Sequence, residues 1–81
     1  MHYSGILVIT DPGRLNDCAG QIEGLAGVEV RHRYPDEDRM ILVQETESVD
    51  EQEQGLREIR ALPGVQLADL VYHHVSDGVR S

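Results

Sequence analysis

The sequence predicts a single α+β domain over residues 1–81, in which a four-stranded antiparallel sheet carries two helices on one face. Two observations favour this fold class. First, GLAGVEV at 24–30 and ALPGVQL at 61–67 are near copies, and each leads from a helix end through glycine into a strand that begins with valine. Second, a short polar turn separates the strand-like segments 28–34 and 39–45, which is typical of an antiparallel hairpin.

The first half of the chain begins with a short apolar run. GILVIT at 5–10 is rich in β-branched residues and predicts a central strand. Asp11 followed by Pro12 predicts an N-cap and the first residue of a helix that extends to residue 26, with Gly27 as its C′ residue. Apolar residues recur every three or four positions and predict one buried stripe, formed by Leu15, Cys18, Ala19, Ile22, Leu25 and Ala26.

The middle of the chain forms the predicted hairpin. In segment 28–34, valines alternate with charged residues, which indicates one face on the core and one in water. The charged residues expected on one face are Glu29, Arg31 and Arg33. PDED at 35–38 is a polar turn, and RMILVQE at 39–45 is the returning strand.

The second helix is predicted over residues 49–62. Ser48 and, three residues later, Glu51 form the sequence pattern of a capping box. Acidic residues in the first turn and arginines in the last turns match the helix dipole. The residues expected to face the core are Val49, Leu56, Ile59 and Leu62.

The last strand lies within GVQLADLVYHH at 64–74, where the alternation changes parity and predicts a bulge near Ala68 and Asp69. Right-handed crossovers make each strand–helix–strand half leave a gap that a strand of the other half fills. The sequence therefore predicts the ferredoxin-like βαββαβ fold.

This fold leaves one sheet face without helices, called the open face below. Strands 5–10 and 39–45 are apolar at both parities, so aliphatic side chains are expected on the open face whichever parity packs on the helices. An exposed apolar patch bordered by charge usually marks a contact surface. The alternatives are a homodimer interface or a patch covered by the tail of the chain.

The charge balance narrows the possible partners. Fifteen acidic against seven basic residues give a formal net charge of −8, the wrong sign for binding nucleic acid or an anionic membrane surface. A basic partner is favoured, although an acidic excess also serves solubility alone. The sequence has no Phe or Trp on which RNA bases could stack. We expect a cytoplasmic protein, because the first residues resemble no signal peptide.

The sequence suggests neither catalysis nor a bound metal. Cys18 is the single cysteine and is expected to be a small buried hydrophobe. His73 and His74 are adjacent and would point to opposite sheet faces, so they cannot chelate one ion together. His2 or His32 could join either of them across the sheet, but no carboxylate spacing supports a metal site. No paired general acid and base is visible.

The segments LAGVEV at 25–30 and LVYH at 70–73, with the apolar strand after MHYSG, resemble the NapD family. The tyrosine–histidine pair at the end of the last strand is the most specific part of this resemblance. The chain departs from the family pattern in its short segment after His74 and in the charged Asp69.

The resemblance implies a cytoplasmic assembly chaperone of periplasmic nitrate reductase. Family members bind the twin-arginine signal peptide of the catalytic subunit precursor through the sheet, hold the precursor back from export and assist molybdenum cofactor insertion. They are not enzymes and carry no cofactor. Applied to this chain, the expected peptide contacts are apolar residues Leu7, Ile9, Ile41 and Val43, carboxylates Glu29 and Glu45, and last-strand residues Val71 and His73.

A different class of function stays open. A small regulatory domain of this fold could bind a metabolite and dimerise through its sheet face. The chaperone hypothesis instead predicts a monomer or weak dimer with no stable membrane association.

Overall fold

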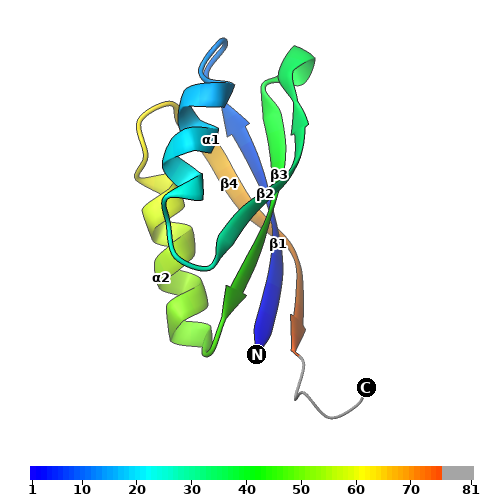
Figure 1. Ribbon diagram of the computed structural model, residues 1–81, viewed down its shortest axis with the longest axis vertical. Helices are drawn as coiled ribbons and strands as arrows, with labels where there is room; N and C mark the ends of the chain where they lie inside the picture. Colours follow the sequence, from blue (N-terminus) through cyan, green and yellow to red (C-terminus); the bar gives the residue numbers. More distant parts are fainter. Residues whose placement is uncertain (76–81) are drawn as a thin grey trace.

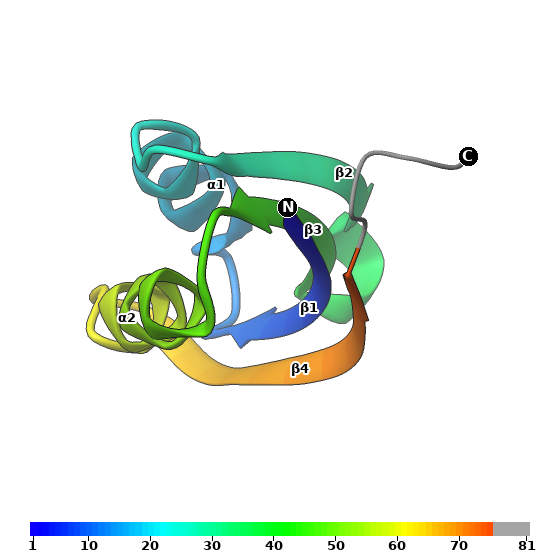
Figure 2. The same cartoon turned by 90° about the horizontal axis from the view of Figure 1, so that it is seen from below.

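The computed structural model describes residues 1–75 and confirms the ferredoxin-like fold. Its elements are β1 (His2–Thr10), α1 (Leu15–Glu23), β2 (Val28–Tyr34), the short 3-10 helix η1 (Pro35–Glu37), β3 (Arg39–Thr46), α2 (Val49–Arg60) and β4 (Val65–Val75). The strands form one antiparallel sheet in the order β2-β3-β1-β4. Both helices lie on one face of this curved sheet (Figures 1 and 2).

The core lies between this sheet face and the helices. Even-numbered residues of β1 and β3 point toward the helices, and Ile6, Val8, Met40 and Leu42 have no exposed surface. The helices bury the predicted residues Leu15, Cys18, Ala19, Ile22, Leu56 and Ile59 against them. The apolar periodicity of the sequence thus identified most of the core.

The predicted start of α1 is wrong. Residues 11–14 form a turn in which the Arg14 N–H donates to the Asp11 carbonyl oxygen at 3.0 Å, and the helix begins only at Leu15. Gly13 has φ +79°, which a right-handed helix cannot include. Asp11 lies outside α1, whose N-cap residue is Arg14, and its side chain accepts a hydrogen bond from Gln66 Nε2 at 2.8 Å.

The two helix exits are alike in the structure, as their sequences indicate. α1 ends at Glu23, three residues earlier than predicted, and the chain turns into β2 through Gly27 at φ +76°. α2 ends at Arg60, and the chain turns into β4 through Gly64 at φ +90°. Glycine is favoured at both turns because other residues rarely adopt this left-handed conformation.

The capping box of α2 is confirmed, with one difference. Ser48 Oγ accepts a hydrogen bond from the Glu51 N–H at 3.1 Å, while the Glu51 side chain accepts from the N–H of Glu47. Val49 was predicted to face the core but is 45% exposed, and Gln52 is buried instead. The buried face of α2 therefore includes the polar Gln52 and does not include Val49.

Two bulges in β4 change which residues share a face. The predicted position of the bulge is wrong, because Ala68 and Asp69 pair regularly with Val8 and Leu7. The register shifts instead lie around Gln66 and Val71, each of which is an extra residue of β4 relative to β1.

β2 also contains a bulge, at Arg31, which the predicted alternation did not include. His32 pairs with Ile41 and Arg33 pairs with Met40, so Arg33 lies on the helix side. Its guanidinium contacts Glu23 Oε2 at 3.3 Å and Asn16 Oδ1 at 3.2 Å, both on α1. Glu29, Arg31 and Arg33 therefore do not share one face.

Candidate functional site

The centre of the open face is an aliphatic strip on β1 and β3. The structure places Leu7, Ile9, Ile41 and Val43 there, all partly exposed. Leu7 pairs directly with Ile41, and Val43 pairs with Gly5, so the side chains are cross-strand neighbours. The opposite parity packs on the helices, and this leaves the strip facing outward on the side that carries no helix (Figure 2).

Tyr72 extends the open face onto β4. It pairs with Gly5, and a Cβ atom added to Gly5 would overlap the tyrosine ring. The ring therefore lies over the glycine, while Tyr72 as a whole residue is 50% exposed. Sequence reasoning missed this contact, although a glycine inside a strand often marks a close approach of another group.

A negatively charged border lies at one end of the strip. Glu45 pairs with Tyr3 and Glu29 pairs with Val43, and both carboxylates are exposed. They line a hollow of about 310 Å³ on this border, together with Tyr3, Gly27, Val28, Arg31 and Val43. Arg31 contacts Glu29 Oε1 at 3.5 Å, so Glu29 already has a basic neighbour.

The structure does not bring His73 onto the open face, and this part of the expected placement is wrong. His73 pairs with the buried Ser4 on the helix side, because the extra residue Val71 shifts the parity of β4. His74 pairs with Tyr3 and takes the open-face position, with ring centroids 6.4 Å apart. Val71 is exposed and lies within the bulge.

His73 has a partner on the helix side. Its Nε2 lies 3.1 Å from Nδ1 of His2, and the two rings are inclined by only 6°. One imidazole donates a hydrogen bond to the other. Residues 1–75 contain no group of three or more His, Cys, Asp or Glu side chains arranged to hold a metal ion.

Cys18 lies in the core, as the sequence predicts. Burial raises the pKa of its thiol above the ordinary value of 9.0, and its Sγ donates to the Pro63 carbonyl oxygen at 3.5 Å. A neutral buried thiol is a poor nucleophile.

Within residues 1–75, none of the helices is long and apolar enough to cross a membrane.

Comparisons with known proteins agree with this architecture. A family model described as NapD protein matches residues 1–77. The solution structure of the E. coli Tat proofreading chaperone protein NapD superposes with a TM-score of 0.83 at 24% identity, covering 96% of this chain and 82% of that one. A comparison with curated protein sequences finds no significant match.

Two archaeal structures share the fold. A hypothetical protein from Pyrococcus horikoshii matches with a TM-score of 0.81 at 21% identity, covering 96% of this chain and 94% of that one. A transcriptional regulatory protein of the ASNC family from Pyrococcus furiosus matches with a TM-score of 0.72 at 18% identity, covering 96% of this chain and 55% of that one. At these identities the likeness concerns the fold alone.

Proposed function

Because the chain belongs to the NapD family, we propose that it is a proofreading chaperone for a protein exported by the twin-arginine route. Its ligand is the twin-arginine signal peptide of the periplasmic nitrate reductase catalytic subunit precursor. The observation that carries this proposal is the aliphatic strip of the open face beside the carboxylates Glu29 and Glu45. A leader of this class combines an apolar stretch with a basic segment, so both halves of the ligand find a matching surface.

In the bound state, the apolar stretch of the leader lies over Leu7, Ile9, Ile41 and Val43. Apolar burial contributes about 25 cal/mol per Å² and supplies most of the affinity. Tyr72 borders the strip, and its exposed side adds apolar surface for the leader.

The paired arginines of the leader contact Glu45 and Glu29. Guanidinium–carboxylate pairs are directional and often bidentate, so they set the orientation of the peptide and speed its association. Glu29 would exchange Arg31 for an arginine of the ligand, whereas Glu45 forms no ion pair within residues 1–75. We therefore assign Glu45 the larger share of this recognition.

Holding the leader keeps the precursor from export while the molybdenum cofactor is inserted into the catalytic subunit. In this role the protein works in the cytoplasm as a monomer or weak dimer, performs no catalysis and needs no cofactor of its own.

Calorimetric titration with a synthetic leader tests the proposal. We expect tight binding that weakens when both arginines of the peptide are changed to lysine, because lysine cannot form the bidentate pair. A folded protein that gives no heat with either peptide would overturn the proposal.

A matched pair of variants tests the binding surface. Val43→Asp places a charge on the strip, whereas Val49→Asp makes the same change at an exposed position on α2. We expect the first variant to weaken leader binding strongly and the second to leave it unchanged, with circular dichroism showing that both remain folded. The double variant Leu7→Asp, Val43→Asp should abolish binding, and retained affinity would exclude the strip as the site.

The alternative function is a regulatory domain that dimerises through the sheet, since a transcriptional regulatory protein of the ASNC family shares the fold. A monomer in size-exclusion chromatography would count against this rival. A stable dimer whose open face is occluded would favour it.

A further inference from the structure

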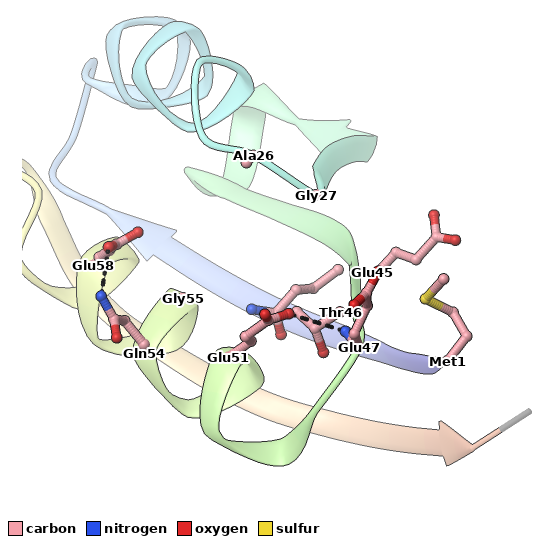
Figure 3. A pocket seen from close by; sticks show the side chains of 11 residues that line it. Met1, Ala26, Gly27, Glu45, Thr46, Glu47, Glu51, Gln54, Gly55 and Glu58 are labelled. Atoms are coloured by element: carbon pink, nitrogen blue, oxygen red, sulfur yellow. Dashed lines mark hydrogen bonds between the residues drawn. The ribbon is translucent and has the colours of Figure 1, made fainter.

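A second hollow lies on the helix side of the sheet and is strongly acidic. It has a volume of about 610 Å³ and is formed by the α1–β2 turn, the end of β3 and one face of α2 (Figure 3). We call it the acidic pocket; its lining residues include four glutamates, Glu45, Glu47, Glu51 and Glu58, as well as the amino-terminal residue Met1, and neither lysine nor arginine. Its polar side-chain groups are therefore mainly hydrogen-bond acceptors.

The α2 face of the acidic pocket has an unusual composition. Glu51, Gln54, Gly55 and Glu58 follow the i, i+3, i+4, i+7 spacing of one helix face, and all four line the pocket (Figure 3). Glu58 accepts one hydrogen bond from Gln54 at 3.4 Å, and Glu51 accepts one from the Glu47 N–H at 3.1 Å. An ionised carboxylate has about four acceptor sites, so both keep capacity for a ligand.

A buried carboxamide supplies a separate indication of a ligand. Gln44 lines the acidic pocket, is only 1% exposed, and donates from Nε2 to the Gln52 carbonyl oxygen at 3.2 Å. This bond fixes the orientation of the amide and leaves Oε1 buried without a hydrogen-bond partner. Gly55 allows the approach, because a Cβ at that position would overlap Nε2 of Gln44. Buried polar groups without partners are rare and call for an explanation.

The Gln44 oxygen lacks a hydrogen-bond donor, and the carboxylates around it favour a donor that is also cationic. A small metal ion does not fit, since no group of three or more suitable ligands converges within residues 1–75. A guanidinium fits better, because it presents five N–H donors in a plane and can contact acceptors that lie too far apart for one ion.

We propose that the acidic pocket binds arginine side chains of a basic peptide segment. Resting on the proposed function, this segment consists of basic residues of the leader beyond the arginine pair that contacts Glu45 and Glu29. Glu45 and Gly27 line both the acidic pocket and the hollow beside Glu29. A peptide that leaves the open face over this end of the sheet therefore enters the pocket directly.

The test uses N-acetyl-arginine amide as the probe and two-dimensional NMR of the ¹⁵N-labelled protein. We expect concentration-dependent shifts at the side-chain NH₂ groups of Gln44 and Gln54 and at the Gly55 amide. N-acetyl-lysine amide should bind more weakly. Shifts scattered evenly over the acidic surface, or absent from these groups, would overturn the proposal.

Two double variants with equal changes in net charge distinguish specific binding in the acidic pocket from nonspecific electrostatic attraction of the probe to the protein. Glu51→Gln, Glu58→Gln should weaken probe binding about tenfold, since it removes two charge-assisted acceptors. Glu37→Gln, Glu53→Gln changes exposed carboxylates that do not line the pocket and should alter binding less than about twofold. Equal losses in both double variants would refute the pocket.

The full leader distinguishes failure of this inference from failure of the proposed function. Leader binding that depends on Val43 but is indifferent to Glu51 and Glu58 would refute the pocket and keep the chaperone function. Probe binding in the pocket, combined with no heat from the leader, would refute the chaperone function and keep the guanidinium site.

Discussion

Replacement of Gln44 by leucine should stabilise the protein. The side chain is 1% exposed, makes one hydrogen bond and buries an oxygen without a partner. Leucine has a similar volume and no polar atoms. The Gln52 carbonyl, which loses its contact with Nε2, still lies within α2 and accepts the helical hydrogen bond.

The magnitude follows from two opposing contributions. Loss of the hydrogen bond costs about 1 kcal/mol, and removal of the unpartnered acceptor gains about 1–3 kcal/mol. We expect a net increase of about 1 kcal/mol in the free energy of unfolding. For a domain of this length, that corresponds to a rise in Tm of about 4–8 °C.

Urea unfolding followed by circular dichroism measures this change, with an unchanged m value showing that the comparison is valid. Gln54→Leu makes the same chemical change at an exposed position and should stay within about 0.5 kcal/mol of wild type. A Gln44→Leu protein that is less stable than wild type would refute the reasoning, because the oxygen would then have a stabilising partner in solution. The same variant should bind the arginine probe more weakly.

Three further changes have defined outcomes. Gly27→Ala should cost about 2 kcal/mol in urea unfolding, because φ is +76° and the new Cβ would lie 2.5 Å from the Glu45 carbonyl oxygen; Gly20→Ala, with open space at its position in α1, should instead be neutral or stabilising. Ser48→Ala should cost about 1 kcal/mol through loss of the α2 cap, and an unchanged midpoint would contradict that role. Burial raises the pKa of the Cys18 thiol above 9.0 in the folded protein. The neutral thiol therefore contributes fully to the free energy of unfolding below pH 9, and this contribution is lost as pH rises through the folded-state pKa. Wild type should therefore lose stability above pH 9 more steeply than Cys18→Ala, and parallel pH profiles would contradict this.

The order of elements could be predicted from the sequence because local signals recur. The two glycine–valine helix exits and the capping box at Ser48 depend on neighbouring residues and formed as expected. The start of α1 differs from the prediction, because residues 11–14 form a turn with Gly13 in a left-handed conformation. Asp11 looks like an N-cap, but its carboxylate bonds Gln66, 55 positions away in the chain. The spacing of residues along the sequence does not reveal a hydrogen bond between side chains so far apart in the chain.

The candidate surface was harder to predict than the fold. Strands β1 and β3 are apolar at both parities, so only packing against the helices decides that Leu7 and Val43 face outward. His73 was placed on the wrong face because one extra residue, Val71, reverses the alternation that follows it. Such bulges add a single residue and leave only a weak trace in the sequence.

Gly27 and Glu45 form a common wall between the two hollows. The Glu45 N–H donates to the Gly27 carbonyl oxygen at 2.7 Å, which fixes this wall in place. In the proposed binding mode, the aliphatic strip and the acidic pocket would act together on a peptide that reaches both, since binding at one site raises the effective concentration at the other. Selectivity would then depend on the number of residues between the basic and apolar parts of the peptide. A peptide with the right composition but the wrong spacing would bind more weakly.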